Sequence, residues 1–241
     1  MKISIIVPAY NEERLLPATL QCLRAGCTIF ARRGWGAELI VCDNNSSDRT
    51  AEVAAAGGAR VVFEPVNQIA RARNAGAAAA SGEWLIFVDA DSQPDAALFG
   101  DVGDVIERGQ CMAGGSTVRF AGEDRIARLP VALWNGLSRT LRWAAGSFIF
   151  CCAEAFREIG GFSTALYAAE EIDLFRRLKR LASERRQRIV ILHRHPLLTS
   201  GRKLRLYTWG EGLGFMARTI LDGGRSLKSA KGCYLWYDGR R

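Results

Sequence analysis

Residues 84–91 read WLIFVDAD, five apolar residues in a row followed by two carboxylates that flank an alanine. A short, continuous apolar run of this kind is typical of a strand buried on both faces, as in a parallel sheet. Three comparable runs precede it, at 3–7 (ISIIV), 38–42 (ELIVC) and 60–63 (RVVF), with helix-like segments between them. This alternation predicts an α/β fold with a mostly parallel sheet and helices on both faces.

Right-handed crossovers would bring the carboxyl ends of all four strands to one edge of the sheet, where ligands of open α/β sheets bind. Polar residues gather there: PAYNEE at 8–13, DNNSSD at 43–48 and DAD at 89–91. The first of these turns has no glycine, and the chain has no GK[ST] sequence, so a dinucleotide-binding turn and a P-loop are both excluded.

Asp89 and Asp91 lie two residues apart, so their carboxylates point to the same side while the backbone is extended. Two hard oxygens so placed can hold Mg²⁺ or Mn²⁺, an ion that usually shares its shell with substrate phosphates. The alternative is an Asx turn leading to Ser92 and Pro94.

Composition is that of an ordinary globular protein, with 241 residues, 49% of them apolar and 24% charged. One large domain, or one domain with a C-terminal extension, is expected at this length. Seven cysteines without a CxxC pair, and an N-terminus that begins as a strand, favour a cytoplasmic protein. No apolar stretch approaches 18 residues, so we expect no membrane-spanning segment.

The net charge of +8 is distributed unevenly along the chain. Residues 1–175 carry 16 basic and 21 acidic side chains, whereas residues 176–241 carry 17 basic and 4 acidic. A basic tail suggests nucleic acid, an anionic membrane face or a phosphorylated substrate as partner, or simply a solvated surface. Nucleic acid is disfavoured because few aromatics are interleaved with the arginines. Residues 201–241 are expected to form a basic amphipathic extension that contacts the cytoplasmic face of the membrane peripherally.

Several ordered motifs resemble family 2 glycosyltransferases of the GT-A fold over about residues 2–182. They are ISIIVPAYNEE (3–13), ELIVCDNNSSDRT (38–50), ARARNAGAAAASGEWLIFVDADS (70–92), GGF (160–162) and EEIDLFRRL (170–178). The resemblance implies an inverting enzyme that takes a sugar from a nucleotide-diphosphate donor with the help of Mn²⁺ or Mg²⁺. It implies a GT-A domain at 1–200, with a donor-nucleotide half (1–92) and an acceptor half (93–200).

The same resemblance implies roles for single residues. Arg71, Arg73 and Asn74 lie on one helix, and Arg71 and Asn74 share a face on which a guanidinium would suit a diphosphate. The resemblance places Pro8, Ala9, Tyr10 and Glu12 in a nucleoside pocket and gives base recognition to Asp43. It gives diphosphate contacts to Arg71 and Asn74, ribose and metal contacts to Asp89, and metal contacts to Asp91 and His193. The alternatives are a solvent-facing side chain for Arg71, an Asx turn for Asp43, and a plain basic loop for His193 and His195.

Inverting transfer needs a carboxylate that accepts the proton of the acceptor hydroxyl. At about 100° per residue, Glu171 projects near the middle of an apolar stripe formed by Leu174, Phe175, Leu178 and Leu181. Glu170 lies to the side, and Asp173 is expected to pair with Arg177 one turn later. We therefore expect Glu171 to face inward and act as the base, with Glu170 as the second candidate.

The family usually has Glu-Asp where this chain has Glu170-Glu171, which leaves a catalytically silent sugar-nucleotide-binding module as the alternative. A nucleotidyltransferase is a second alternative, but this class typically begins with a Gly-rich, basic loop, and PAYNEE is neither. The sequence identifies neither sugar, base nor acceptor, which can be lipid-linked or soluble, and it gives no prediction of the oligomeric state.

Overall fold

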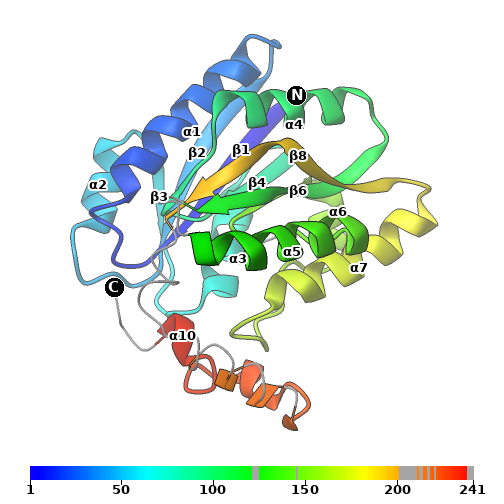
Figure 1. Cartoon of the computed structure of the whole chain (residues 1–241). Coiled ribbons are helices and arrows are strands. Elements are labelled where there is room, and N and C mark those ends of the chain that lie inside the picture. Colours follow the sequence, from blue (N-terminus) through cyan, green and yellow to red (C-terminus); the bar gives the residue numbers. More distant parts are fainter. Residues whose placement is uncertain are drawn as a thin grey trace.

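The computed structural model describes residues 1–120, 125–144, 146–200, 211, 214–215, 218–219 and 221–237, and gives only the backbone of residues 125–130 and 236. Figure 1 shows one central sheet with helices packed on both of its faces. The predicted α/β fold is confirmed.

The N-terminal half forms the parallel part of the sheet. Its strands lie side by side in the order β3-β2-β1-β4, and all three pairings are parallel. In this register Ala9 pairs with Asp43, and Asp43 pairs with Phe63, so the strand ends meet at one edge as predicted. The elements are β1 (Lys2–Ala9), α1 (Leu16–Ala31), β2 (Gly36–Asp43), α2 (Thr50–Ala56), β3 (Arg60–Phe63), α3 (Ile69–Ala79) and β4 (Trp84–Val88).

The second half extends the same sheet, so that its eight strands run in the order β3-β2-β1-β4-β7-β6-β8-β5. Strand β7 is antiparallel to both of its neighbours, β4 and β6. Strand β5 has two residues and helix α6 has six, which is too short for either to leave a periodic signal in the sequence. The elements are β5 (Ser92–Gln93), α4 (Ala96–Glu107), β6 (Cys111–Phe120), α5 (Arg125–Leu141), β7 (Phe148–Cys152), α6 (Ala153–Glu158), α7 (Glu170–Glu184) and β8 (Arg188–Thr199).

Two apolar cores sandwich the sheet. On one face α1 and α4 pack through side chains such as Leu20, Phe30 and Phe99. On the other face α3, α6 and α7 pack through small and aromatic side chains such as Ala70 and Phe175. The stripe of alanines and glycine on α3 lets this helix lie close to the sheet, which brings its polar residues to the carboxyl edge of β1 and β4.

The described part of the C-terminal extension contains η1 (Arg225–Lys228) and α10 (Tyr234–Tyr237). It docks on the body of the protein, because Tyr167 donates its backbone N–H to the Leu227 carbonyl (2.7 Å) and Ile69 donates its N–H to the Tyr237 hydroxyl (3.2 Å). The amphipathic extension expected at 201–241 falls partly outside the described residues, which omit 201–210, 238–241 and several positions between 212 and 220. Among those described, no helix combines the length and apolar character needed to cross a bilayer.

Candidate functional site

Backbone–side-chain hydrogen bonds lock together the loops that follow β1 and β2. Asn11 donates its N–H to the Ser46 hydroxyl (2.9 Å) and accepts the N–H of Ser47 (2.8 Å), while Glu12 donates its N–H to Thr50 (2.8 Å). Asn11 adopts a left-handed backbone (φ 52°), which asparagine tolerates better than most residues. The two loops therefore form one rigid wall. The sequence motifs PAYNEE and DNNSSD predicted polar loops there but not the bonds that join them.

The residues predicted to line a nucleoside pocket lie along this wall. Pro8, Ala9 and Glu12 are buried and Tyr10 is half-buried. Asp43 ends β2 and accepts the N–H of Ser46, three residues on (3.1 Å), which makes a turn one residue wider than the Asx turn that the sequence left open. A carboxylate has a second oxygen, so this turn is compatible with base recognition.

Asn44 fixes the start of α3 and was missed by sequence reasoning. Its side-chain amide donates to the carbonyls of Glu64 (3.2 Å) and Val66 (2.6 Å), and its side-chain oxygen accepts the N–H of Gln68 (2.9 Å). Since Asn44 is almost fully buried, this link between the end of β2 and α3 is shielded from water. The only signal in the sequence was an amide directly after Asp43.

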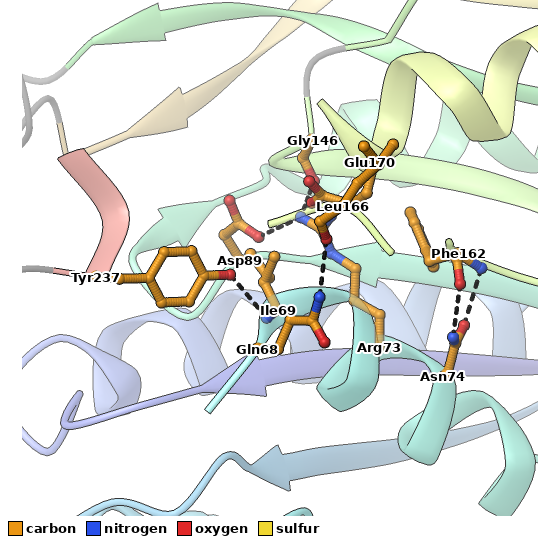
Figure 2. A network of polar contacts seen from close by, with 10 residues as sticks. All are labelled: Gln68, Ile69, Arg73, Asn74, Asp89, Gly146, Phe162, Leu166, Glu170 and Tyr237. Carbon is orange, nitrogen blue, oxygen red and sulfur yellow. Dashed lines mark hydrogen bonds and ion pairs between the residues drawn. The ribbon is translucent and has the colours of Figure 1, made fainter. Parts of the chain in front are cut away.

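Arg73 is the centre of the polar network at the sheet edge (Figure 2). Its guanidinium is 1% exposed and lies 2.7 Å from Glu170 and 3.0 Å from Asp89, and it also donates to the Gly146 carbonyl (2.8 Å). The three partners come from the start of α7, the end of β4 and the segment before β7. One side chain therefore joins three separate segments of the chain.

The expectation that Arg71 and Asn74 together face a diphosphate is not supported by the geometry. Arg71 is exposed, and both polar atoms of the Asn74 amide bond the backbone of Phe162 (2.8 and 2.9 Å). Because α3 packs closely on the sheet, the face of the helix that carries Arg73 is turned toward the sheet edge, where three carboxylates lie nearby. Arg73, which the sequence analysis named without a role, is thus the arginine within the site.

Glu170, and not Glu171, is the more buried member of the acidic pair, which corrects the helical-wheel expectation. Glu170 is 4% exposed, whereas Glu171 is half-buried. A helical wheel orients each residue relative to the apolar stripe that packs on the sheet. At the first turn of α7, however, the neighbouring surface is not the sheet but Arg73 on α3. The predicted pair of Asp173 and Arg177 is confirmed at 2.8 Å.

Burial, and after it the neighbouring charge of Glu171, raise the pKa of the Glu170 carboxyl to about 8 against the opposing effect of Arg73. One arginine faces three carboxylates here: Asp89, Glu170 and Glu171 all act on its charge. In a poorly solvated site such a negative surplus favours either an extra proton or a cation.

The DAD turn is held by the end of β8. Ser92 pairs with Thr199 across β5 and β8, and the Ser200 hydroxyl donates to an Asp91 carboxylate oxygen (2.5 Å). The Asp89 side chain remains 25% exposed. No three His, Cys, Asp or Glu side chains in the described part of the chain form a ready metal cluster. Oxygen donors of this kind suit Mg²⁺ or Mn²⁺ when substrate phosphates and water supply the other ligands.

The structure contradicts His193 as a metal ligand beside Asp91. Leu192, the residue before His193, pairs with Ser116 of β6, whereas Thr199, beside the DAD turn, pairs with Phe120. Ser116 and Phe120 are four residues apart on β6, which is roughly 13 Å along the strand. His193 instead lines a hollow of about 250 Å³ between α4 and β8. The length of β8 and its bulge after Leu192 account for the error, because they separate His193 from the part of the strand that holds the Asp91 turn.

This fold belongs to the α/β proteins whose ligands bind at the carboxyl edge of the sheet, and its rim there is acidic. Residues 4–159 match the sequence model of Glycosyl transferase family 2. The chain therefore belongs to that family.

Curated relatives match over part of their length. An uncharacterized glycosyltransferase of Mycobacterium tuberculosis is 39% identical over 94 residues, which are 39% of this chain and 38% of the relative. The undecaprenyl-phosphate 4-deoxy-4-formamido-L-arabinose transferase of Yersinia enterocolitica is 31% identical over 138 residues, 53% of this chain and 39% of the relative. The chain thus matches less than half the length of each.

Solved structures share the fold over most of the chain. Staphylococcus aureus TarS (residues 1–349) superimposes with a TM-score of 0.63 at 21% identity, covering 84% of this chain and 61% of TarS. Mycobacterium tuberculosis glucosyl-3-phosphoglycerate synthase, in complex with Mn²⁺, UDP and glucosyl-3-phosphoglycerate, has a TM-score of 0.59 at 23% identity, covering 91% and 77%. At these identities the likeness shows the fold alone.

Proposed function

We propose that this protein transfers a sugar from a nucleotide-diphosphate donor to an acceptor hydroxyl, with inversion at the anomeric carbon. The observation that carries the proposal is the Arg73 network, which joins the acidic end of β4 to the acidic start of α7. Donor and acceptor chemistry would thereby meet at one place. Family membership supports it, as do the likenesses to TarS, which has been solved with UDP-GlcNAc, and to the synthase solved with Mn²⁺ and UDP.

The donor would lie along the wall formed by the β1 and β2 loops. In this proposal the nucleoside contacts Pro8, Ala9, Tyr10 and Glu12, Asp43 recognises the base, and Asp89 contacts the ribose. Arg71, exposed at the start of α3, is free of the buried network and is the arginine that can reach a diphosphate from outside. Residues 1–92 would then form the donor half and residues 93–200 the acceptor half.

Asp91 and Asp89 would hold a divalent Mn²⁺ or Mg²⁺ ion. The fit rests on their carboxylate oxygens and on the negative surplus around Arg73, which a cation offsets. When bound, such an ion neutralises charge on the departing diphosphate. The chain's own part is to orient Asp89 through the 3.0 Å ion pair with Arg73 and Asp91 through Ser200.

Glu171 would act as the general base. Glu170 is taken up by Arg73 at 2.7 Å and is buried, so it is poorly placed to reach an acceptor, although it remains the second candidate. Glu171 is half-buried, and its carboxylate lies within 3.6 Å of the position that a side chain on Gly146 would occupy. A small residue at position 146 therefore keeps space beside the proposed base.

The acceptor is proposed to be lipid-linked. The name of the Yersinia relative includes undecaprenyl phosphate, and residues 201–241 carry 9 basic and 3 acidic side chains, a balance that attracts an anionic surface. We accordingly propose a cytoplasmic protein that contacts the cytoplasmic membrane face peripherally through this extension.

The test is the release of nucleoside diphosphate from a panel of sugar nucleotides, measured with Mn²⁺ and with Mg²⁺ in the presence of candidate acceptors. We expect release from at least one donor, and a product of inverted anomeric configuration. Binding of a sugar nucleotide without any release, in every combination, would instead identify a silent binding module.

A further inference from the structure

Helix α5 presents an apolar face to solvent. Leu133, Leu137 and Leu141 are spaced four residues apart and are 66%, 46% and 37% exposed. We call these three residues the leucine face. Seven large apolar side chains are exposed among the described residues, and three of them lie on this one helix. Such clustering along a helix marks an interaction surface more than scattered exposure does.

The leucine face is held outward by the opposite side of the helix. Asn135 accepts the N–H of Val118 (3.0 Å) and donates to its carbonyl (2.9 Å), which fixes α5 against β6. Ser138 is buried and donates to the Trp143 carbonyl (2.5 Å), and Trp134 packs on the core. Asn135 and Ser138 thus face the protein together with Trp134, whereas the three leucines face away from it, so α5 turns part of its apolar surface outward.

Positive charge lies at the C-terminal end of this face. No acidic residue occurs between positions 125 and 153, and Arg142, which directly follows Leu141, is exposed. Figure 1 shows α7 alongside α5, and Lys179 on α7 donates to the Leu141 carbonyl and lies 5.2 Å from the Trp143 ring centroid. Burial, and after it the nearby charge of Arg142, lower the pKa of Lys179.

We propose that the leucine face of α5 is a docking surface for an anionic lipid bilayer. Apolar side chains that enter the headgroup region, with arginines beside them on the lipid phosphates, are how an amphipathic helix lies in a membrane interface. A second copy of the chain fits less well, because a two-fold contact through α5 would set Arg142 against a segment, residues 125–153, that carries no acidic side chain. The surface belongs to the body of the protein, so the inference is independent of residues 201–241 and of the proposed activity.

The test is sedimentation of the full chain with vesicles of phosphatidylcholine alone or with phosphatidylglycerol. We expect binding only when phosphatidylglycerol is present. Leu133→Gln combined with Leu137→Gln keeps two good helix formers and should weaken the partition coefficient at least about tenfold. The matched control is Phe63→Gln, which changes an exposed large apolar side chain (60%) outside both α5 and residues 201–241 and should bind as the wild type does.

Each other outcome overturns the proposal. It fails if wild type does not bind anionic vesicles, if the double variant binds undiminished, or if Phe63→Gln alone abolishes binding. It also fails if the double variant dissociates a wild-type dimer in vesicle-free buffer, because the occupant would then be a second copy. Melting temperature checks that the variants fold. Donor turnover without vesicles should be unchanged in the double variant, so a failure of the proposed activity would be seen separately.

Discussion

Nη1 of Arg73 lies 2.7 Å from Oε1 of Glu170, across 97 residues of sequence, and both side chains are buried. The same guanidinium is paired with Asp89 at 3.0 Å. This ion pair joins the strand that ends in the acidic turn to the helix that begins with the acidic pair. It therefore ties the geometry of the two proposed half-sites to one side chain.

Replacing Arg73 by Gln should lower the free energy of unfolding by at least about 3 kcal/mol, because it leaves buried carboxylates without their counter-charge. Urea denaturation monitored by circular dichroism measures the change. Arg71→Gln, two residues away on the same helix and exposed, is the matched control and should stay within about 0.5 kcal/mol of wild type. Equal, small effects for both variants would show that the buried network contributes little to stability.

The GGF motif offers a matched pair of glycine substitutions. Gly160 and Gly161 both have a left-handed backbone (φ 78° and 70°), but a Cβ on Gly161 would lie 2.7 Å from Oδ1 of Asn74, whereas Gly160 has open space around it. Gly160→Ala should cost about 1–2 kcal/mol from backbone strain, and Gly161→Ala should cost more. Thermal and urea unfolding of the two variants measure the difference. An identical loss would mean that the contact between Asn74 and Phe162 yields without cost.

Much of the fold was predictable because apolar runs are local signals. The strands Arg60–Phe63 and Trp84–Val88 were predicted residue for residue, and the parallel order followed from the helices between strands. The polar links were not predictable in this way. Asn44 looks like any loop asparagine in the sequence, and its partners at 64–68 are set only by the folded chain.

The site was predicted as a set of segments but not side chain by side chain. From sequence spacing alone, Arg71 and Asn74 share one face of their helix, and Glu171 lies near the middle of the apolar face of its helix. Which residue is buried depends on what lies opposite, and Arg73 and Glu170 face each other across the sheet edge. The distance between His193 and the Asp91 turn could not be predicted from residue numbers either, because the bulge in β8 after Leu192 moves His193 toward α4.

The raised pKa of Glu170 makes stability depend on pH. A carboxyl whose pKa rises on folding, from an ordinary value of 4.5 to about 8, binds its proton more tightly in the folded protein. Its contribution to the free energy of unfolding is therefore complete below about pH 4.5 and is lost as the pH rises toward 8. Urea unfolding across this range should show a decline that Glu170→Gln flattens. A slope that is the same in wild type and variant would contradict the assignment.

Glu171→Gln should reduce sugar transfer at least about a hundredfold while donor binding persists, because an amide cannot accept the acceptor proton. Single-turnover assays separate chemistry from binding, and calorimetry measures donor affinity. Asp173→Asn, two residues further along α7 and paired with Arg177, is the control and should retain turnover. If Glu171→Gln is fully active, Glu170 becomes the candidate base.

Titration calorimetry of the full chain with sugar nucleotides, with and without Mn²⁺, tests the central claim most directly. The account predicts a donor whose affinity depends on Mn²⁺ and falls at least about tenfold in Asp91→Asn, since one carboxylate ligand of the ion would be lost. Donor binding that is indifferent both to Mn²⁺ and to Asp91→Asn, or no binding of any sugar nucleotide, would contradict it.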